Sequence, residues 1–204
     1  MRRVLFLLVF SLAASSAFAE ESNRDRLIKT NACSGCDLAG VDLSGVGLIH
    51  ADLRGADLSG AKLQSVNLNA SQLDGAKFEN ADLRSALLGG AHMEGAIFKG
   101  ATMDGATLTL AKLVNANFEA ASLVGVRFDN ANLESANFER AKLVDADLYN
   151  ARLFFANFSE ADLSGADLSA ADIGEADFTD AVSNEKTTCP KFGSGPCWGE
   201  DSTK

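Results

Sequence analysis

Aromatic residues, proline and histidine are all scarce in this sequence of 204 residues. Aromatics make up 7% of the chain, and there are two prolines and two histidines. Two histidines leave little material for histidine-based catalysis or metal binding. Basic residues are also in deficit, since 18 Lys and Arg face 28 Asp and Glu and give a formal net charge of −10. This charge argues against nucleic acid as the partner, because binding a phosphate backbone needs a basic surface.

Hydrophobic residues, by contrast, make up 47% of the chain, which is not the composition of a disordered protein. With so few aromatics, the core has to be built from small residues. The length fits one domain, or at most two.

The first nineteen residues have the pattern of a Sec-type signal peptide. A short basic start at 1–3 precedes an apolar run at 4–12, and the small residues before Glu20 predict cleavage after Ala19. The apolar run is about half of what a membrane span requires, so no span is expected after signal removal. We therefore expect a periplasmic or secreted protein. Its mature chain of 185 residues keeps 16 bases and 28 acids, for a net charge of −12.

A five-residue period runs from residue 36 to residue 180 without insertion or deletion, which makes 29 units. The third residue of every unit is Leu, Phe, Met or Ile, and the first is Ala in 23 units and small in the others. Apolar residues two and then three positions apart fit neither an α-helix nor a flat strand. A short extended piece with its first and third side chains inward, followed by a polar turn, satisfies the pattern. Repetition of that bend gives a coil.

Phenylalanine indicates how many units close one coil. Six third-position phenylalanines recur at intervals of 20 from residue 78 to residue 178, and only Phe128 lies off this series. Four units therefore make one turn, and the six rings are predicted to stack in one internal column at roughly 4.8 Å. The same arithmetic predicts an outer column of amides that hydrogen-bond along the axis. Its members are Asn117, Asn137 and Asn157.

The tandem pattern A-[DN]-[LF]-x-x closely resembles the pentapeptide repeat family, in an exported and bacterial form, over 145 of the 185 mature residues. The resemblance implies an all-β fold, a right-handed quadrilateral parallel β-helix with four units per coil, which agrees with the column arithmetic. The units then make about seven coils in a rod on the order of 35 Å long. The expected organisation is a signal peptide at 1–19, an N-terminal cap at 20–35, the β-helix at 36–180, and a C-terminal cap and tail at 181–204 in which Trp198 covers the last coil.

The four cysteines lie at the two ends of this rod, Cys33 and Cys36 at the start and Cys189 and Cys197 at the end. Only pairing within each end is feasible, because a disulfide spans about 6 Å between Cα atoms and the ends are about 35 Å apart. The same distance excludes a zinc site that uses all four thiolates. Two disulfides that clip the caps are expected, since export makes oxidation the default. The CxxC spacing at 33–36 also fits a thiol-disulfide centre, but nothing around it predicts a feature that would lower a thiol pKa.

No catalytic set, cofactor site or metal site is predicted. His50 and His92 fall at outward positions on different faces and coils, so no nucleophile and base converge around either. The recurring second-position aspartates, such as Asp37 and Asp42, are expected to form solvated faces with turn-stabilising hydrogen bonds. Calcium binding lacks any recognisable loop spacing.

The stretch from 156 to 180 holds seven acids and no base. Family members that protect or inhibit DNA gyrase are thought to present such a surface as a mimic of duplex DNA, so the resemblance carries this alternative. The export signal, the unbroken register and the bases along the middle coils weigh against it, and solubility and edge protection are the expected roles. The acidic surface consists of Glu160, Asp162, Asp167, Asp172, Glu175, Asp177 and Asp180.

Apolar residues at outward positions mark a second candidate surface. Tyr149, Phe154 and Phe155 lie at fourth and fifth positions, and aromatics on an outer face are enriched at interfaces, including those of homodimers. Local cover by a long neighbour such as Arg152 is the alternative, and the sequence leaves both open. Other apolar residues at such positions are Leu110, Val114, Val124 and Val144.

Together these observations predict a non-enzymatic, exported structural or protein-interaction module with a protein partner and no cofactor. An acidic DNA-mimic regulator of a DNA-binding enzyme such as gyrase is the alternative. A CxxC thiol-disulfide protein is the third hypothesis.

Overall fold

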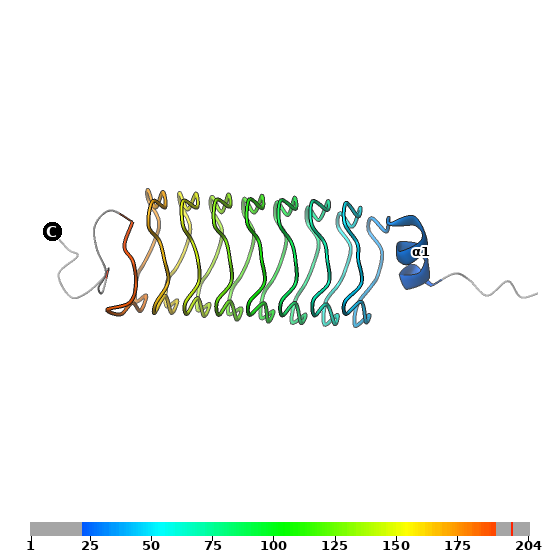
Figure 1. Ribbon diagram of the computed structural model, residues 1–204, viewed down its shortest axis with the longest axis horizontal. Coiled ribbons are helices and arrows are strands. Elements are labelled where there is room, and N and C mark those ends of the chain that lie inside the picture. The colour runs from blue at the N-terminus through cyan, green and yellow to red at the C-terminus, as the bar shows by residue number, and fades with distance from the viewer. Residues whose placement is uncertain (1–21, 191–196, 198–204) are drawn as a thin grey trace, which may run out of the picture.

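The computed structural model describes residues 22–190 and residue 197, and it has the form of a straight rod of stacked coils with a helix at one end (Figure 1). The helix, α1, spans Asn23–Thr30 and is the one helix among the described residues. Beyond it, the chain pairs through single-residue parallel β-bridges instead of longer strands. Within the described ranges, no helix is long and apolar enough to cross a membrane.

The bridges fix the repeat of the coil. From Ala32 to Val182, each bridge joins a residue to the one twenty positions further along, and the bridging residue is always the second of its unit. Backbone hydrogen bonds follow the same register; the N–H of Leu58, for example, donates to the carbonyl of Lys77 at 2.7 Å. Four five-residue units therefore make one coil, as the spacing of the phenylalanines predicts.

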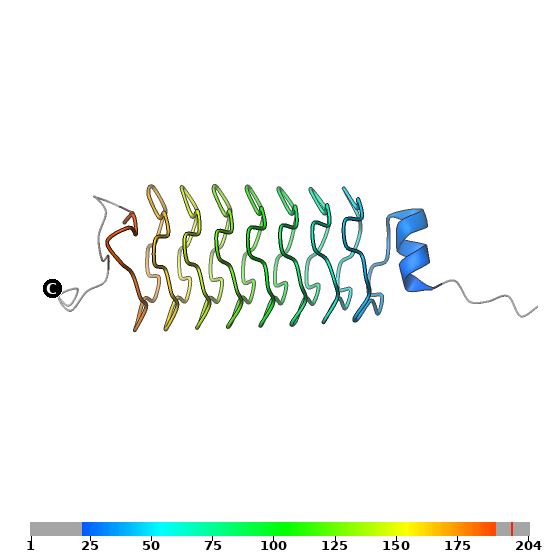
Figure 2. The same cartoon turned by 60° about the horizontal axis from the view of Figure 1, so that its bottom comes forward.

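A tight turn closes each unit. The N–H of a first residue donates to the carbonyl of the third residue of the preceding unit, as Ala56 does to Leu53 at 3.0 Å. The fifth residue has a positive φ, 64° at Gly55, whereas the fourth does not, which is the pattern of a type II turn. Gly adopts this conformation without steric cost, which explains its frequency at the fifth position. Four turns bring the chain back onto the preceding coil (Figure 2).

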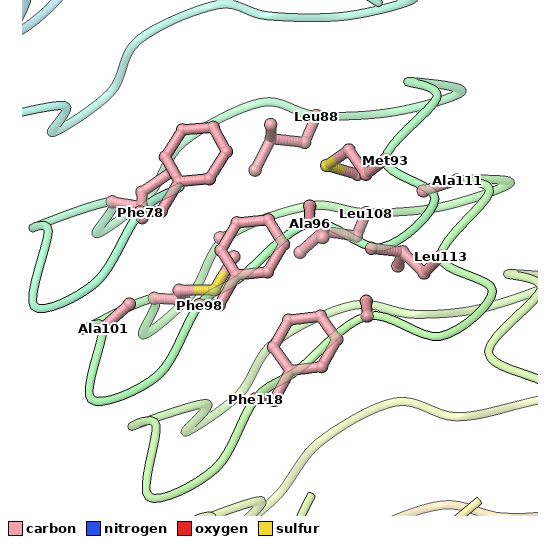
Figure 3. Close-up of a cluster of buried hydrophobic side chains, with 14 of the residues drawn as sticks. Phe78, Leu88, Met93, Ala96, Phe98, Ala101, Leu108, Ala111, Leu113 and Phe118 are labelled. Atoms are coloured by element: carbon pink, nitrogen blue, oxygen red, sulfur yellow. The ribbon is translucent and has the colours of Figure 1, made fainter. Parts of the chain in front are cut away.

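First and third side chains point inward and fill the coil, and nearly all of them are fully buried. Figure 3 shows Phe78, Phe98 and Phe118 stacked one above another. Successive ring centroids in the column from residue 78 to residue 178 are 4.8–5.0 Å apart, with planes within 5° of parallel. This confirms the predicted column. Phe128, two units away on the opposite side of the coil, contacts Phe118 and Phe138 edge-on.

Two polar side chains are buried among the described residues, Ser71 and Thr187. The hydroxyl of Ser71 donates to the carbonyl of Leu48 at 2.9 Å and accepts from the N–H of Ala51 at 3.1 Å. Thr187 likewise donates to the carbonyl of Leu163 at 3.0 Å. Because both hydroxyls have partners, their burial carries little penalty.

The coil is longer than the repeat in the sequence. Ala32 bridges Asp52, so residues 31–35 form a unit in register with the rest. At the other end Thr188 bridges Asp167, twenty-one positions earlier, so the chain absorbs one extra residue and still continues the ladder. The predicted signal peptide at 1–19 and Trp198 lie outside the described residues.

Helix α1 lies at the N-terminal end of the rod (Figure 1). The hydroxyl of Ser22 caps it by accepting an amide N–H of the first turn at 3.1 Å, and Asn31 ends it with a φ of 57°. Leu27 is fully buried in the core. The side-chain amide of Asn23 donates to the carbonyl of Asp37 at 2.9 Å. The helix thus covers the open end of the core and pairs with the first coils.

The substitution Leu113→Lys tests the inward register, because Leu113 is fully buried within the coil. We expect it to abolish cooperative unfolding or to cost at least about 4 kcal/mol, since a buried ammonium has no partner. The matched substitution Lys112→Glu, on the exposed neighbour, should change stability by no more than about 0.5 kcal/mol. Thermal melts followed by circular dichroism would contradict the register if the two variants melted alike.

Candidate functional site

Second-position carboxylates are engaged in holding the turns. Oδ1 of Asp57 accepts the N–H of Ser59 at 3.0 Å, and Oδ1 of Asp177 accepts the N–H of Thr179 at 2.9 Å. Hydrogen bonds from the side chains and backbone of Ser59 and Thr179 lower the pKa of these two carboxyls. The groups are therefore held ionised as acceptors, as expected for turn-stabilising residues, and they do not form acid–base pairs.

Stacked amides run along one side of the rod as predicted. The side-chain amide of Asn157 donates to Oδ1 of Asn137 at 3.0 Å, and that of Asn137 donates to Oδ1 of Asn117 at 3.4 Å. A second pair, at the fifth position, joins Asn150 to Asn130 at 2.8 Å. These ladders consume polar groups that a ligand would otherwise contact.

The acids of residues 156–180 encircle the rod. Asp162, Asp167, Asp172 and Asp177 occupy the second positions of four successive units, and four units make one coil. They therefore point from four different sides within a single turn. The sequence identifies the acids as one surface, but the fold distributes them as a ring around the C-terminal end.

Bases of the preceding coil offset part of this ring. Both oxygens of Glu160 accept from Arg140, at 2.8 and 2.9 Å, and this pairing lowers the pKa of Glu160. Asp172 stands one bridge away from Arg152, and Asp162 one bridge away from Lys142. Basic side chains of the preceding coil therefore neutralise part of the negative charge of this segment.

The carboxylate of Asp82 is the centre of a hydrogen-bonded cluster on the surface. Arg84 donates two hydrogen bonds to its carboxylate, at 2.9 and 2.6 Å, and Gln64 donates a further one. The bidentate arginine is the main cause that lowers the pKa of Asp82 to about 2. Because the carboxylate is fully paired, this cluster stabilises the coil and offers no free base.

The three candidate aromatics do not form one patch. Tyr149 closes one side of the coil, whereas Phe154 and Phe155 close the next. Tyr149 and Phe155 are about half exposed, but Phe154 is partly buried against Gly174 of the following coil. A Cβ at residue 174 would collide with the Phe154 ring, so Gly174 leaves the space that the ring fills. The structure gives no support to a homodimer through these three residues.

Both cysteine pairs are disulfide-bonded, in the pairing that the sequence predicts. Cys33 bonds to Cys36 and Cys189 to Cys197, with Cα separations of 5.3 and 5.6 Å. Cys33 is fully buried and Cys36 is 7% exposed, because they occupy a third and a first position in the core. A buried sulfur is inaccessible to an attacking thiolate, so the first disulfide is placed as a structural clip.

The two histidines lie two coils apart. His50 is exposed in a turn with a φ of 59°, and His92 stands between Gln72 and Lys112 in the bridge ladder. In residues 22–190 and Cys197, no group of three or more His, Cys, Asp or Glu is placed to hold a metal ion. The fold therefore does not bring the two histidines together in one site.

Within the repeat at 36–180, two exposed apolar residues are additional to those named from the sequence. Ile49 is 47% exposed and Leu87 is 39% exposed, although each stands at an outward position where the repeat favours polar residues. Their signal in the sequence is an aliphatic side chain at an outward position, the fourth for Ile49, as for Val114, and the second for Leu87.

The substitution Gly174→Ala tests the packing of Phe154. We expect a loss of about 1–3 kcal/mol in the free energy of unfolding, because the added methyl group displaces the ring. The control is Gly47→Ala, which adds the same group where no heavy atom lies within 4 Å and should be nearly neutral. Chemical denaturation measures both, and equal effects would contradict the packing.

Acid should destabilise the coil partly through Asp82. The pKa of Asp82 is about 2 in the folded protein and 3.8, its ordinary value, in the unfolded chain. Its carboxylate therefore stabilises the folded state fully above pH 3.8, and this stabilisation is lost as the pH falls through the folded pKa. Melts between pH 7 and pH 2 should therefore show Asp82→Asn most destabilised at pH 7 and converging on the native protein near pH 2. Gly174→Ala, which changes no titratable group, is the control, and its difference from the native protein should stay the same across this range. A gap for Asp82→Asn that does not change with pH would contradict this.

Comparison with known proteins agrees with this geometry. The family described as pentapeptide repeats matches in eight copies, over 33–69, 42–80, 76–113, 111–148 and 146–182. A trypsin-treated form of QnrB1, a plasmid-mediated fluoroquinolone resistance protein, is 21% identical and has a TM-score of 0.60, covering 75% of this chain and 89% of its own. It supports the fold.

HetL, a pentapeptide repeat protein involved in heterocyst differentiation regulation from the cyanobacterium Nostoc sp. strain PCC 7120, is 28% identical, with a TM-score of 0.41. It covers 80% of this chain and 84% of its own. Curated proteins give no match. The family match spans far more than half of the sequence, from residue 33 to residue 182, and the chain belongs to the pentapeptide-repeat family.

Proposed function

We propose that this chain is an exported, non-enzymatic module that binds a protein partner through the sides of a right-handed, four-sided β-helix of about seven coils. One observation carries the proposal. The inward positions are filled by buried side chains, and many outward polar groups are used within the coil for turns, ladders and ion pairs. The outward side chains that are not used in this way, on the four long sides of the rod, are the ones free to contact a partner.

Rigidity makes such sides suitable for binding. Each unit bonds to the coil before and the coil after, so an outward side chain is carried on backbone that is fixed on both sides. Binding to a preformed surface avoids the entropy cost of ordering a loop. The two disulfides at the ends of the described chain add to this constraint.

Export is part of the proposal. The predicted signal peptide ends at Ala19, and four cysteines in two disulfides suit an oxidising compartment. An exported location also separates the protein from cytoplasmic enzymes that act on DNA.

The DNA-mimic hypothesis rests on the family resemblance and on the acidic segment at 156–180. Its weakness is the arrangement of charge, since duplex DNA carries a phosphate charge for about every 1.7 Å of its axis. A mimic therefore needs acids along the length of the rod, whereas the densest acids here ring one coil. The thiol-disulfide hypothesis is weakened by the burial of Cys33 and Cys36.

A photo-crosslinking experiment tests the module. A benzophenone amino acid is placed, one variant at a time, at four second positions of one coil, one on each side of the rod. We expect the protein from the exported fraction to begin at Glu20. We also expect one discrete crosslinked adduct with the partner, formed from one or two sides of the rod only. The four positions are Lys112, Asn117, Ser122 and Arg127.

The unfolded variant Leu113→Lys, carrying the same crosslinker, is the control and should lose the adduct. Absence of any adduct, or equal adducts from all four sides, would contradict a specific binding side. Inhibition of gyrase supercoiling by micromolar protein would replace the proposal with the DNA-mimic function.

A further inference from the structure

One side of the rod carries no charge over four successive coils. Residues 41–120 comprise sixteen units, and twelve of them contain at least one Asp, Glu, Lys or Arg. The bridges from Gly47 through Asn67 and Leu87 to Thr107 stack the other four on the same side. We call this surface the charge-free face, because it has no Asp, Glu, Lys or Arg; the exposed His50 is its one titratable side chain. It is formed by units 46–50, 66–70, 86–90 and 106–110.

Large aliphatic side chains project from the charge-free face. Leu110 is 64% exposed, and Ile49 and Leu87 are 47% and 39% exposed. Leu110 also has a φ of 61°, a left-handed conformation that costs a non-glycine residue about 1–2 kcal/mol. The turn imposes this conformation on the fifth residue of other units as well, so what distinguishes Leu110 is the exposure of a large aliphatic side chain.

Between these projecting side chains, two glycines leave the surface recessed. Gly47 and Gly90 leave open space where a side chain would stand, with no heavy atom within 4 Å of the Cβ position. Most other outward residues of the face are small or medium-sized and uncharged, such as Asn67, Ala70 and Thr109. Projecting aliphatic groups beside empty glycine positions suit contact with another flat side that has the same relief.

The distribution of charge around the rod favours a second copy of the chain as the occupant of the charge-free face. The chain has a net charge of −10, and the other three sides carry acids in the same four coils. Each of those sides carries three acids and two bases in these coils, so each is net negative, and two copies that met through the same side would bring an excess of carboxylates together. The charge-free face lets two copies approach without that repulsion. Acids ring the C-terminal coil as well, so an antiparallel pair, which keeps the two C-terminal ends apart, is favoured over a parallel one.

We propose that the charge-free face is the contact between two antiparallel copies of this chain, in which Ile49, Leu87 and Leu110 of each copy are covered. Four coils at roughly 4.8 Å each make the face about 19 Å long, so the contact belongs to the weak, reversible class that buries less than about 1,200 Å² in total. The inference stands independently of the proposed function. It also uses a different side from Phe155.

The test replaces both leucines with the residue that the repeat itself favours. In Leu87→Asn/Leu110→Asn the second position receives a common repeat residue, and the fifth receives one that tolerates a positive φ. We expect an unchanged or higher melting temperature together with at least about tenfold weaker self-association. A melting temperature that does not fall while self-association weakens separates a role in the contact from a role in folding.

Sedimentation equilibrium of residues 20–204, with both disulfides intact, measures the association from about 10 µM to about 1 mM. The native protein should approach twice the monomer mass, and higher salt should not weaken the dimer because the contact is uncharged. The matched control is Phe155→Asn, at the same position of its unit with a φ of 60° and 54% exposure, and it should dimerise as the native protein does. A native protein that stays monomeric throughout, an undiminished dimer in the double variant, or an equal loss in Phe155→Asn would each overturn the proposal.

Discussion

The parallel bridge between residues twenty positions apart is the constraint on which the rest of the molecule depends. It places each side chain directly against its counterparts in the coils before and after, so composition in a column matters more than composition along the chain. Phe98 and Phe118 stack with centroids 4.9 Å apart for this reason, and Asn137 donates to Asn117 for the same reason. Stability in such a repeat accumulates from contacts between neighbouring coils. A polar residue is tolerated inside only where a neighbouring coil provides partners, as it does for Ser71.

The turn imposes a second constraint that explains most of the surface. A positive φ at the fifth position favours Gly and Asn, and an amide at the fourth position favours an Asp or Asn acceptor at the second. Much of the acidic excess is thus a consequence of building turns. Charge that serves structure carries little information about a partner. The informative positions are those where the repeat preference is broken, such as Leu87 at a second position and Leu110 at a fifth.

Much of the architecture was predictable because one period carries it. The twenty-residue coil, the phenylalanine column, the amide column and the disulfide pairs all followed from spacing. Two features did not. The unit at 31–35 begins with Asn31 in place of a small apolar residue, and an extra residue before Thr187 shifts the last bridge to twenty-one positions, so a strict period fails at both ends. The bridge ladder tolerates both departures because it depends on backbone pairing and an inward side chain, whichever residue type supplies it.

The surface was harder to predict because proximity in sequence was taken for proximity in space. Tyr149 and Phe155 are six residues apart yet lie on different sides, and the acids of one segment point in four directions. The reverse holds for Leu87 and Leu110, which are distant in sequence but share one side. The arithmetic that located the phenylalanine column, applied to the gaps between charged residues, would have located the charge-free face from sequence alone. In a coil of fixed period, residues that share a side of the rod therefore recur at intervals of twenty in the sequence. Residues that break the turn preference in the same column are the ones whose substitution should change binding while leaving folding intact.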